Sequence, residues 1–259
     1  MTFSIHESID PNGAFEMIFN SHPAPGAPYE DRPIVREKLR IPKTDRFIER
    51  PRITNLLTRS KDQFPATLVS GRSGTGKTAI AASYAAKHDR VAWYSVESTD
   101  VVWPVFSRYF CAALRRAGMA LSLTETACET RSPSKNDIAR YLANIFCFAD
   151  GSPRELPSLI VLDDIHHLFD AHWFGDFFNL LLYSLPAGSH LLMLCRSRPP
   201  GPVWRLRSKQ MLDVLDEKVI AFDLQETKAL FESLGLPESG ADTAHRDSFG
   251  RVAKLIGSA

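Results

Sequence analysis

The octapeptide Gly71-Arg72-Ser73-Gly74-Thr75-Gly76-Lys77-Thr78 carries more information about this chain than any other segment. It fits the pattern G-x-x-x-x-G-K-[ST], a loop that holds phosphate groups with its backbone. Its three glycines let the chain curl so that consecutive N–H groups point at anionic oxygens. The pattern predicts that Lys77 reaches the β- and γ-phosphates and that the Thr78 hydroxyl contacts Mg²⁺. We therefore predict that residues 71–79, including Ala79 just behind the loop, bind a nucleotide.

The segments on either side of this loop support the prediction. Residues 65–70 form a short apolar run, which is typical of a buried strand. Residues 78–87 are rich in alanine and contain no glycine or proline, which favours a helix. A strand, a loop and a helix in this order place the phosphates at a helix N-terminus. This context favours a nucleotide site over the alternative, a glycine-rich turn with a purely structural role.

Composition limits the class of protein. A length of 259 residues suffices for one large domain or two smaller ones. The net charge of +1 gives no general attraction to nucleic acid or to anionic membranes. The 4 cysteines form no C-x-x-C pair, so neither a zinc site nor a disulfide framework is indicated. The N-terminus does not resemble a secretory signal, and no apolar segment is long enough to cross a bilayer, so we expect a cytoplasmic protein without a membrane partner.

Beyond the loop, predicted strands and helices alternate, which is typical of an α/β fold with a parallel sheet and covering helices. Apolar runs predict further strands at residues 91–96, 159–162, 190–195 and 219–222. Helical spacing of apolar residues predicts helices at 53–57, 101–117, 135–148 and 173–185. After residue 225 the pattern is helical only, with a break at 235–237.

These patterns divide the chain into three parts. We predict an irregular arm at 1–38, a nucleotide-binding ATPase domain at 39–223 and a small helical subdomain at 224–259. Two segments are expected to be loops: the polar stretch 124–133 and the basic stretch that holds Arg205, Arg207 and Lys209. A solvated loop is the expected role of these cations, rather than contact with DNA.

Acidic residues follow the predicted strand 159–162, at the sheet edge where open α/β folds bind ligands. Asp163 is the predicted Mg²⁺ ligand, and Asp164 is predicted to orient or deprotonate an attacking water. The alternative is a strand end that carries acidic residues without a role. His166 and His167 can contact a phosphate or order Asp164, but a solvent-facing or capping role is the commoner case and is our expectation.

An arginine follows the next strand directly. Arg196 is predicted to detect the γ-phosphate, because a guanidinium is always charged and binds oxyanions with two hydrogen bonds. Arg198 is a weaker candidate for the same role. Lys77, Asp164 and Arg196 are thus the predicted catalytic residues.

Several blocks of the sequence together resemble the nucleotide-binding module of the MalT-like, LuxR-type transcription activators. These proteins belong to the signal-transducing STAND class of P-loop ATPases. The resemblance runs from about residue 38 to the C-terminus. It is carried by residues 38–42, 47–52, 93–97, 162–166 and 196–200, beside the phosphate loop.

The resemblance implies more than the residues alone predict. It implies a P-loop NTPase three-layer sandwich whose parallel strands have the order 5-1-4-3-2, with an extra strand between the phosphate-loop strand and the acidic strand. It makes Phe47, Ile48 and Arg50 candidates for contact with adenine. It also implies that ATP favours an assembly-competent form and ADP a resting form, that hydrolysis is slow, and that homologous ATPase domains associate.

The sequence departs from this family at three places. Ile165 stands where relatives carry an aromatic residue, and Gly250-Arg251-Val252 replaces a Gly-x-Pro turn. No residues are left for a winged-helix lid, sensor repeats or a DNA-binding domain, so a fragment and a minimal switch are both open. We predict an ATP/ADP-binding switch with weak Mg²⁺-dependent ATPase activity. The alternatives are a non-hydrolysing module that pairs with homologous regulators and, less favoured, a small-metabolite kinase.

Overall fold

The computed structural model describes residues 33–43, 48–121, 131–148, 151–186 and 188–257. The described residues from 34 onward belong to one compact unit, which contains a sheet of 5 strands with all pairs parallel. The strands are β1 (Ala66–Ser70), β2 (Val91–Ser95), β3 (Leu159–Asp163), β4 (His190–Cys195) and β5 (Leu212–Leu215). Their order is β2-β3-β4-β1-β5, so the order 5-1-4-3-2 is confirmed and β4 is the extra strand beside β1.

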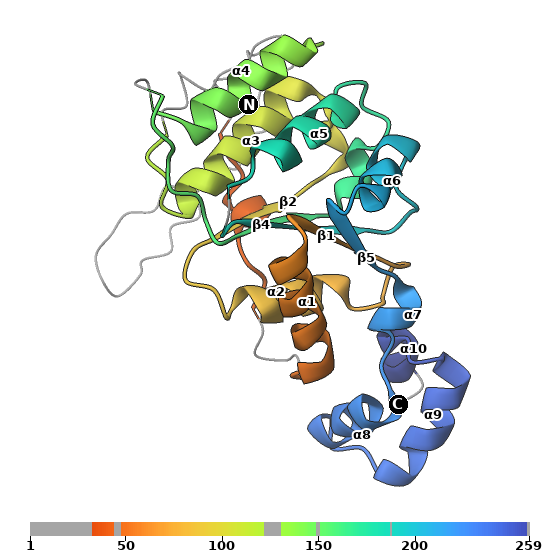
Figure 1. The fold of residues 1–259 in the computed structure, drawn as a ribbon. Helices are drawn as coiled ribbons and strands as arrows, with labels where there is room; N and C mark the ends of the chain where they lie inside the picture. The colour runs from red at the N-terminus through yellow and green to blue at the C-terminus, as the bar shows by residue number, and fades with distance from the viewer. Residues whose placement is uncertain (1–32, 44–47, 122–130, 149–150, 187, 258–259) are drawn as a thin grey trace, which may run out of the picture. The chain divides into compact units, whose positions relative to one another are not determined.

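Helices cover both faces of the sheet, which gives the predicted three-layer sandwich (Figure 1). The helices on one face are α3 (Trp103–Arg116), α4 (Lys135–Phe146), α5 (Phe174–Ser184) and α6 (Gly201–Ser208). Those on the other face are α1 (Pro51–Gln63) and α2 (Lys77–Ala85). Neighbouring strand residues alternate between the two cores, with Leu68 in the first and Val69 in the second. Burial on both faces explains why the central strands are almost continuously apolar.

The first core is dominated by aromatic rings. Trp103 of α3 meets Trp173 edge to face at a centroid distance of 5.0 Å, and Phe106 meets Phe177 of α5 in the same way at 5.0 Å. Such contacts add to the burial of apolar area and define the relative placement of α3 and α5. The short 3₁₀ helices η3 (Ser98–Val101) and η4 (Ile165–Leu168) follow the carboxyl ends of β2 and β3.

The predicted strand at 219–222 is wrong. The fifth strand is Leu212–Leu215, and residues Glu217–Ile220 form the short helix α7. Asp216 starts this helix because its Oδ1 accepts hydrogen bonds from the N–H groups of Lys218 and Val219. β5 lies at the sheet edge and only Leu212 and Leu215 are buried, so its sequence contains no continuous apolar run.

The expected loop around Arg205, Arg207 and Lys209 is also wrong in part, because α6 includes the two arginines and ends at Ser208. A proline lies within the first two positions of this helix, where its missing N–H is not needed. Val203 and Leu206 anchor the helix in the first core, while the three cations remain exposed. The loop predicted at 124–133 lies mostly outside the described residues.

The predicted C-terminal helices are confirmed. They are α8 (Leu224–Ser233), the 3₁₀ helix η5 (Glu238–Gly240), α9 (Ala241–Ser248) and α10 (Val252–Gly257). They enclose a small core of their own, made of Phe222, Leu230, Phe231, Ala241, Ala244 and Leu255. Among the described helices, none is both long and apolar enough to cross a bilayer.

The beginning of the compact unit is attached to the sheet by a buried ion pair. The 3₁₀ helix η2 (Arg36–Leu39) brings Lys38 to Asp100, with Nζ–Oδ1 and Nζ–Oδ2 distances of 2.8 and 3.0 Å. Both side chains are buried, and Leu39 joins the first core. Residues 34–38 therefore pack with the compact unit, although the sequence pattern assigned them to the arm.

A buried histidine lies at the opposite end of the sheet from the phosphate loop. His190 Nδ1 lies 3.0 Å from the carbonyl oxygen of Phe64, so this nitrogen carries the proton. Its Nε2 then accepts from the hydroxyl of Thr67 at 2.9 Å, and Thr67 is bonded in turn to Ser60. Both nitrogens of the neutral ring therefore have hydrogen-bond partners. Protonation of Nε2 would remove the acceptor to which the Thr67 hydroxyl donates. Burial lowers the pKa of His190 to about 4.

We expect this histidine to make folding stability depend on pH. Unfolded His190 titrates near pH 6.5, so its contribution is complete above that pH and is lost as the pH falls towards 4, by about 3 kcal/mol in all. Urea unfolding of the wild type and of His190→Gln between pH 7 and pH 4 measures the effect. The wild type should lose more stability than the variant over this window. Replacing the exposed His172 by glutamine should leave the wild-type slope unchanged.

Candidate nucleotide-binding site

The phosphate loop connects β1 to α2 at the carboxyl edge of the sheet. Gly74 and Gly76 have φ values of 76° and 83°, in the left-handed region that residues with a Cβ atom rarely adopt. The Thr75 hydroxyl donates to the carbonyl oxygen of Arg72 at 2.9 Å and closes the curl from within. The loop ends where α2 begins, so backbone N–H groups and the helix dipole face the same space.

Lys77 lies across the mouth of this curl. Its Nζ donates to the carbonyl oxygens of Gly71 and Arg72, at 2.6 and 2.9 Å. The side chain is buried, and burial lowers the pKa of Lys77. An ammonium held by two carbonyl oxygens above a ring of N–H donors is a suitable partner for phosphate oxygens, which would replace those carbonyls.

The next residue links the loop to the acidic strand. The Thr78 hydroxyl donates to Asp163 Oδ2 at 2.9 Å, and Asp163 is buried at the end of β3. Burial raises the pKa of Asp163, while the hydrogen bond from Thr78 opposes that shift. A hydroxyl and a carboxylate are the hard oxygen donors that Mg²⁺ prefers. The two residues therefore fit the predicted metal role, with most of the remaining ligands supplied by phosphates and water.

The second aspartate is paired with the predicted phosphate sensor. Arg196 Nε and Nη2 donate to the two carboxylate oxygens of Asp164, at 3.0 and 2.8 Å. Asp164 has a φ of 54° and stands at the start of η4. His166 Nδ1 lies 3.7 Å from Asp164 Oδ1, and its ring lies 4.2 Å from the ring of His167, at an angle of 32° to it. His166 is thus directed at the carboxylate and is mostly buried, in contrast to the expected solvent-facing role.

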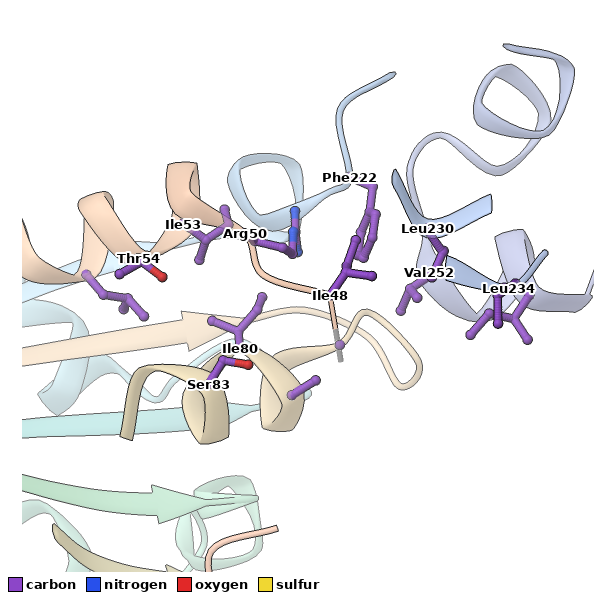
Figure 2. Close-up of a pocket in the computed structure, with 14 residues that line it drawn as sticks. Ile48, Arg50, Ile53, Thr54, Ile80, Ser83, Phe222, Leu230, Leu234 and Val252 are labelled. Atoms are coloured by element: carbon purple, nitrogen blue, oxygen red, sulfur yellow. The ribbon is translucent and has the colours of Figure 1, made fainter. Parts of the chain in front are cut away.

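A cavity of about 520 Å³ lies beside the phosphate loop, between α1, α2 and the helical subdomain (Figure 2). Its size is within the range of sites that bind small molecules. The walls are largely aliphatic and aromatic: Ile48, Arg50, Ile53, Thr54, Leu57, Gly76, Ala79, Ile80, Ser83, Phe222, Leu230, Leu234, Val252 and Ile256. Because Gly76 and Ala79 also belong to the loop and the helix behind it, the cavity adjoins the phosphate-binding curl.

Among the described residues that line this cavity, Arg50 is the only arginine or lysine. Its Nη2 donates to Glu226 Oε2 at 2.6 Å and to the carbonyl oxygen of Ala221 at 3.0 Å. The guanidinium carbon lies 4.0 Å from the centre of the Phe222 ring. Burial lowers the pKa of Arg50. Within the described residues, its Nε and Nη1 have no hydrogen-bond partner, so buried donors remain for a ligand.

The same glutamate joins the ATPase core to the helical subdomain. Glu226 Oε2 also accepts from Arg52 Nη2 at 3.0 Å and from the N–H of Asp223 at 3.0 Å, where it completes the cap of α8. Burial alone would raise the pKa of Glu226, but the hydrogen bonds from Arg50 and Arg52 outweigh it and lower the pKa. The orientation of Arg50 in the cavity therefore depends on α8.

The predicted binding residues differ in where they lie relative to the cavity. Ile48, Arg50 and Ala79 line the cavity, whereas Phe47 lies outside the described residues. The N–H and the guanidinium of Arg72 are both bonded to Glu217 at the start of α7. Ser73 and Gly74 are exposed at the tip of the loop.

One wall of the cavity was not predicted. Phe222, Leu230 and Val252 come from the linker, α8 and α10. The available signal was the turn Gly250-Arg251-Val252, whose position in the sequence matches a family motif that approaches the nucleotide. Val252 does approach the phosphate loop, since its Cγ1 lies 3.3 Å from the position that a Cβ atom on Gly76 would take.

Comparisons with known proteins agree with this geometry. A family model described as an AAA ATPase domain matches residues 46–194. The transcriptional regulator MalT of Vibrio parahaemolyticus is 27% identical over 187 residues. The crystal structure of a STAND protein with a tetratricopeptide repeat sensor from Pyrococcus horikoshii superposes with a TM-score of 0.58 at 19% identity. The similarity to the Pyrococcus structure shows a common fold and no more.

These relatives are much longer than the matching region. The alignment covers 71% of this chain but 20% of the Vibrio regulator, and the superposition covers 86% of this chain but 31% of the Pyrococcus protein. More than half of the chain matches the family model, including the phosphate loop and the acidic strand. The chain therefore belongs to the AAA ATPase domain family, and within it resembles the nucleotide-binding module of MalT-like regulators of the STAND class.

Proposed function

We propose that this chain is an ATP/ADP-binding switch module with slow Mg²⁺-dependent ATPase activity, acting in the cytoplasm in signal transduction by a LuxR-type regulator. The observation that carries the proposal is the continuity of the site. Gly76 and Ala79 line an apolar cavity suited to a base, and the same two residues belong to the last part of the phosphate loop and to the helix behind it. Residues 39–223 would form the ATPase domain and 224–259 the subdomain that closes the base cavity.

The base cavity suits a purine. Its aliphatic walls and the Phe222 ring supply apolar contact with a flat aromatic ring. The unpartnered N–H donors of Arg50 would meet acceptor nitrogens on the edge of adenine. Leaving these donors unpaired costs free energy, so a base with acceptors on this edge is favoured over an apolar ligand.

The groups at the sheet edge suit hydrolysis of the terminal phosphate. Asp164 would accept a proton from the attacking water, while Lys77 and Arg196 would stabilise the charge on the γ-phosphate oxygens. Thr78 and Asp163 would hold Mg²⁺, which neutralises charge on the β- and γ-phosphates when bound. These side chains lie at or just after the carboxyl ends of β1, β3 and β4, which supports the proposal.

Calorimetric titration of the folded protein with ATP and ADP, with and without Mg²⁺, tests the binding. We expect both nucleotides to bind, and Mg²⁺ to strengthen the binding of ATP. GTP should bind more weakly, because its exocyclic groups differ at the edge that Arg50 faces. The absence of heat with either adenine nucleotide would refute the proposed function.

Replacing Asp164 by asparagine is expected to lower ATP turnover about 100-fold while ADP affinity stays unchanged, because a general base contributes factors of this order. Asparagine tolerates the left-handed φ of 54° at this position, so the fold should persist. Phosphate release under saturating ATP is the measurement. Asp170→Asn, an exposed neighbour in the chain, serves as the matched control. Turnover like that of the wild type in Asp164→Asn would remove Asp164 from this role.

One observation favours a second candidate, a non-hydrolysing module that pairs with homologous ATPase domains. Both oxygens of Asp164 are already engaged by Arg196, so the carboxylate is not free to take a proton. In that case ATP and ADP would bind, but turnover would equal that of a Lys77→Ala variant. Turnover above that background decides in favour of the ATPase.

A further inference from the structure

The ion pair between Asp164 and Arg196 joins two groups that the proposed reaction uses separately. The fork of Nε and Nη2 is satisfied by the two carboxylate oxygens, at 3.0 and 2.8 Å. The same fork is the part of an arginine that binds two phosphate oxygens. One guanidinium edge cannot serve a carboxylate and a phosphate at once, so the two acceptors must compete for it.

The two partners differ in their freedom to move. Asp164 is held by its backbone, because its N–H donates to Asp163 Oδ1 at 2.9 Å and it begins η4. The Arg196 side chain is 48% exposed. It also borders a cavity of about 250 Å³ whose wall includes Gly71 and Arg72 of the phosphate loop. The arginine therefore has room to turn towards a phosphate while the aspartate stays in place.

We propose that Arg196 is a positioning residue that withholds Asp164 from the attacking water until a γ-phosphate draws the guanidinium away. The inference rests on the proposed function of this site. ADP lacks the γ-phosphate and leaves the ion pair intact. ATP exchanges one partner of Arg196 for another, and the freed carboxylate then faces the water beside the terminal phosphate. Readiness for hydrolysis is thereby coupled to recognition of the third phosphate.

Competition has a consequence that binding alone can measure. Breaking the Asp164–Arg196 pair removes the carboxylate as a competitor, so Asp164→Asn should bind a non-hydrolysable ATP analogue more tightly than the wild type. Because a partly exposed ion pair is weak, the expected gain in affinity for the ATP analogue is about three- to fivefold. Affinity for ADP should not change. The loss of a negative charge near the phosphates would also strengthen ATP binding. This charge effect must be distinguished from the release of Arg196.

A double-mutant cycle provides the separation. Affinities for the ATP analogue and for ADP, both with Mg²⁺, are measured calorimetrically for the wild type, Asp164→Asn, Arg196→Gln and the double variant. The gain should vanish in the Arg196→Gln background, because no guanidinium remains to be released. It should persist with Arg198→Gln, because the Arg198 guanidinium lies 5.3 Å from the Trp204 ring and, within the described part of the chain, is not bonded to Asp164.

The outcomes distinguish the inference from the proposed function. A gain that persists in the Arg196→Gln background would show charge repulsion alone and overturn the inference. No gain in Asp164→Asn would overturn it as well, with the nucleotide site left standing. Wild-type protein that binds neither ATP nor ADP would refute the proposed function itself.

Discussion

Replacing Lys77 with alanine is expected to lower ATP affinity about 100-fold and turnover about 1000-fold. The side chain is buried at the mouth of the curl and its Nζ is within hydrogen-bond distance of two loop carbonyls, so it is already positioned where phosphate oxygens would lie. Alanine removes a charge-assisted contact to the β- and γ-phosphates. Calorimetric titration and phosphate release measure the two effects.

The control must show that the loss is not a loss of fold. Lys87 lies just beyond α2, carries the same charge and is about half exposed, so Lys87→Ala should bind and turn over ATP like the wild type. Circular dichroism and urea unfolding of Lys77→Ala should resemble those of the wild type, because alanine favours the first turn of α2. ATP affinity within a few-fold of the wild type in folded Lys77→Ala would contradict the assignment of the loop.

The parts of the site that were predicted from sequence are those that depend on neighbouring residues. The curl of residues 71–78 is determined by its own glycines and by the helix that follows. Asp163 ends, and Asp164 follows, a strand so apolar that only a central position in a sheet suits it. Parallel strands bring their carboxyl ends to one edge, so the loop, the acids and Arg196 meet without further information.

The parts that were missed depend on distant contacts. β5 is only four residues long and is interrupted by Asp213, and it becomes a strand because Ala66 and Val69 of β1 pair with Leu212 and Leu215. The apolar stretch 219–222 does not form a strand: its first two residues end α7, whose first turn is capped by Asp216. A local pattern cannot report a pairing that is formed across the sheet.

The base cavity shows the same limit more clearly. Arg50 was a candidate through family resemblance, but its partner Glu226 lies 176 residues away in the sequence. Phe222 and Val252 were not predicted as walls because they reach the cavity only through the packing of the helical subdomain. Tertiary structure thus adds the subdomain to the proposed nucleotide site, so the proposed function depends on its attachment to the sheet domain.

A glycine lies where the helical subdomain contacts the linker. Gly250 has a φ of 71°, and its carbonyl oxygen accepts a hydrogen bond from the N–H of Phe222 at 2.9 Å. A Cβ atom on Gly250 would overlap the Phe222 carbonyl oxygen and lie 3.2 Å from the Cβ atom of Ala221. These neighbours are backbone atoms of the linker and a short side chain, so they cannot move aside at low cost. Phe222, which makes this contact, and Val252, two residues after Gly250, both line the base cavity.

We expect Gly250→Ala to destabilise the packing of the helical subdomain by about 4 kcal/mol, from left-handed strain and overpacking together. Because Phe222 and Arg50 are in contact, the displaced linker should also open the base cavity and weaken ADP binding at least tenfold. Gly257→Ala is the matched control: no atom lies within 4 Å of its added Cβ, and its φ is not positive. Urea unfolding and ADP titration of both variants measure the contrast.

The contrast also tests whether the subdomain belongs to the nucleotide site. If Gly250→Ala loses stability but binds ADP like the wild type, then the cavity walls supplied by Phe222, Leu230 and Val252 do not hold the base. If its unfolding curve matches that of Gly257→Ala, the close approach of Gly250 to the linker is not required. Loss of both stability and ADP affinity in the first variant alone would show that the helical subdomain completes the binding site, because the substitution touches neither the phosphate loop nor the acidic strand.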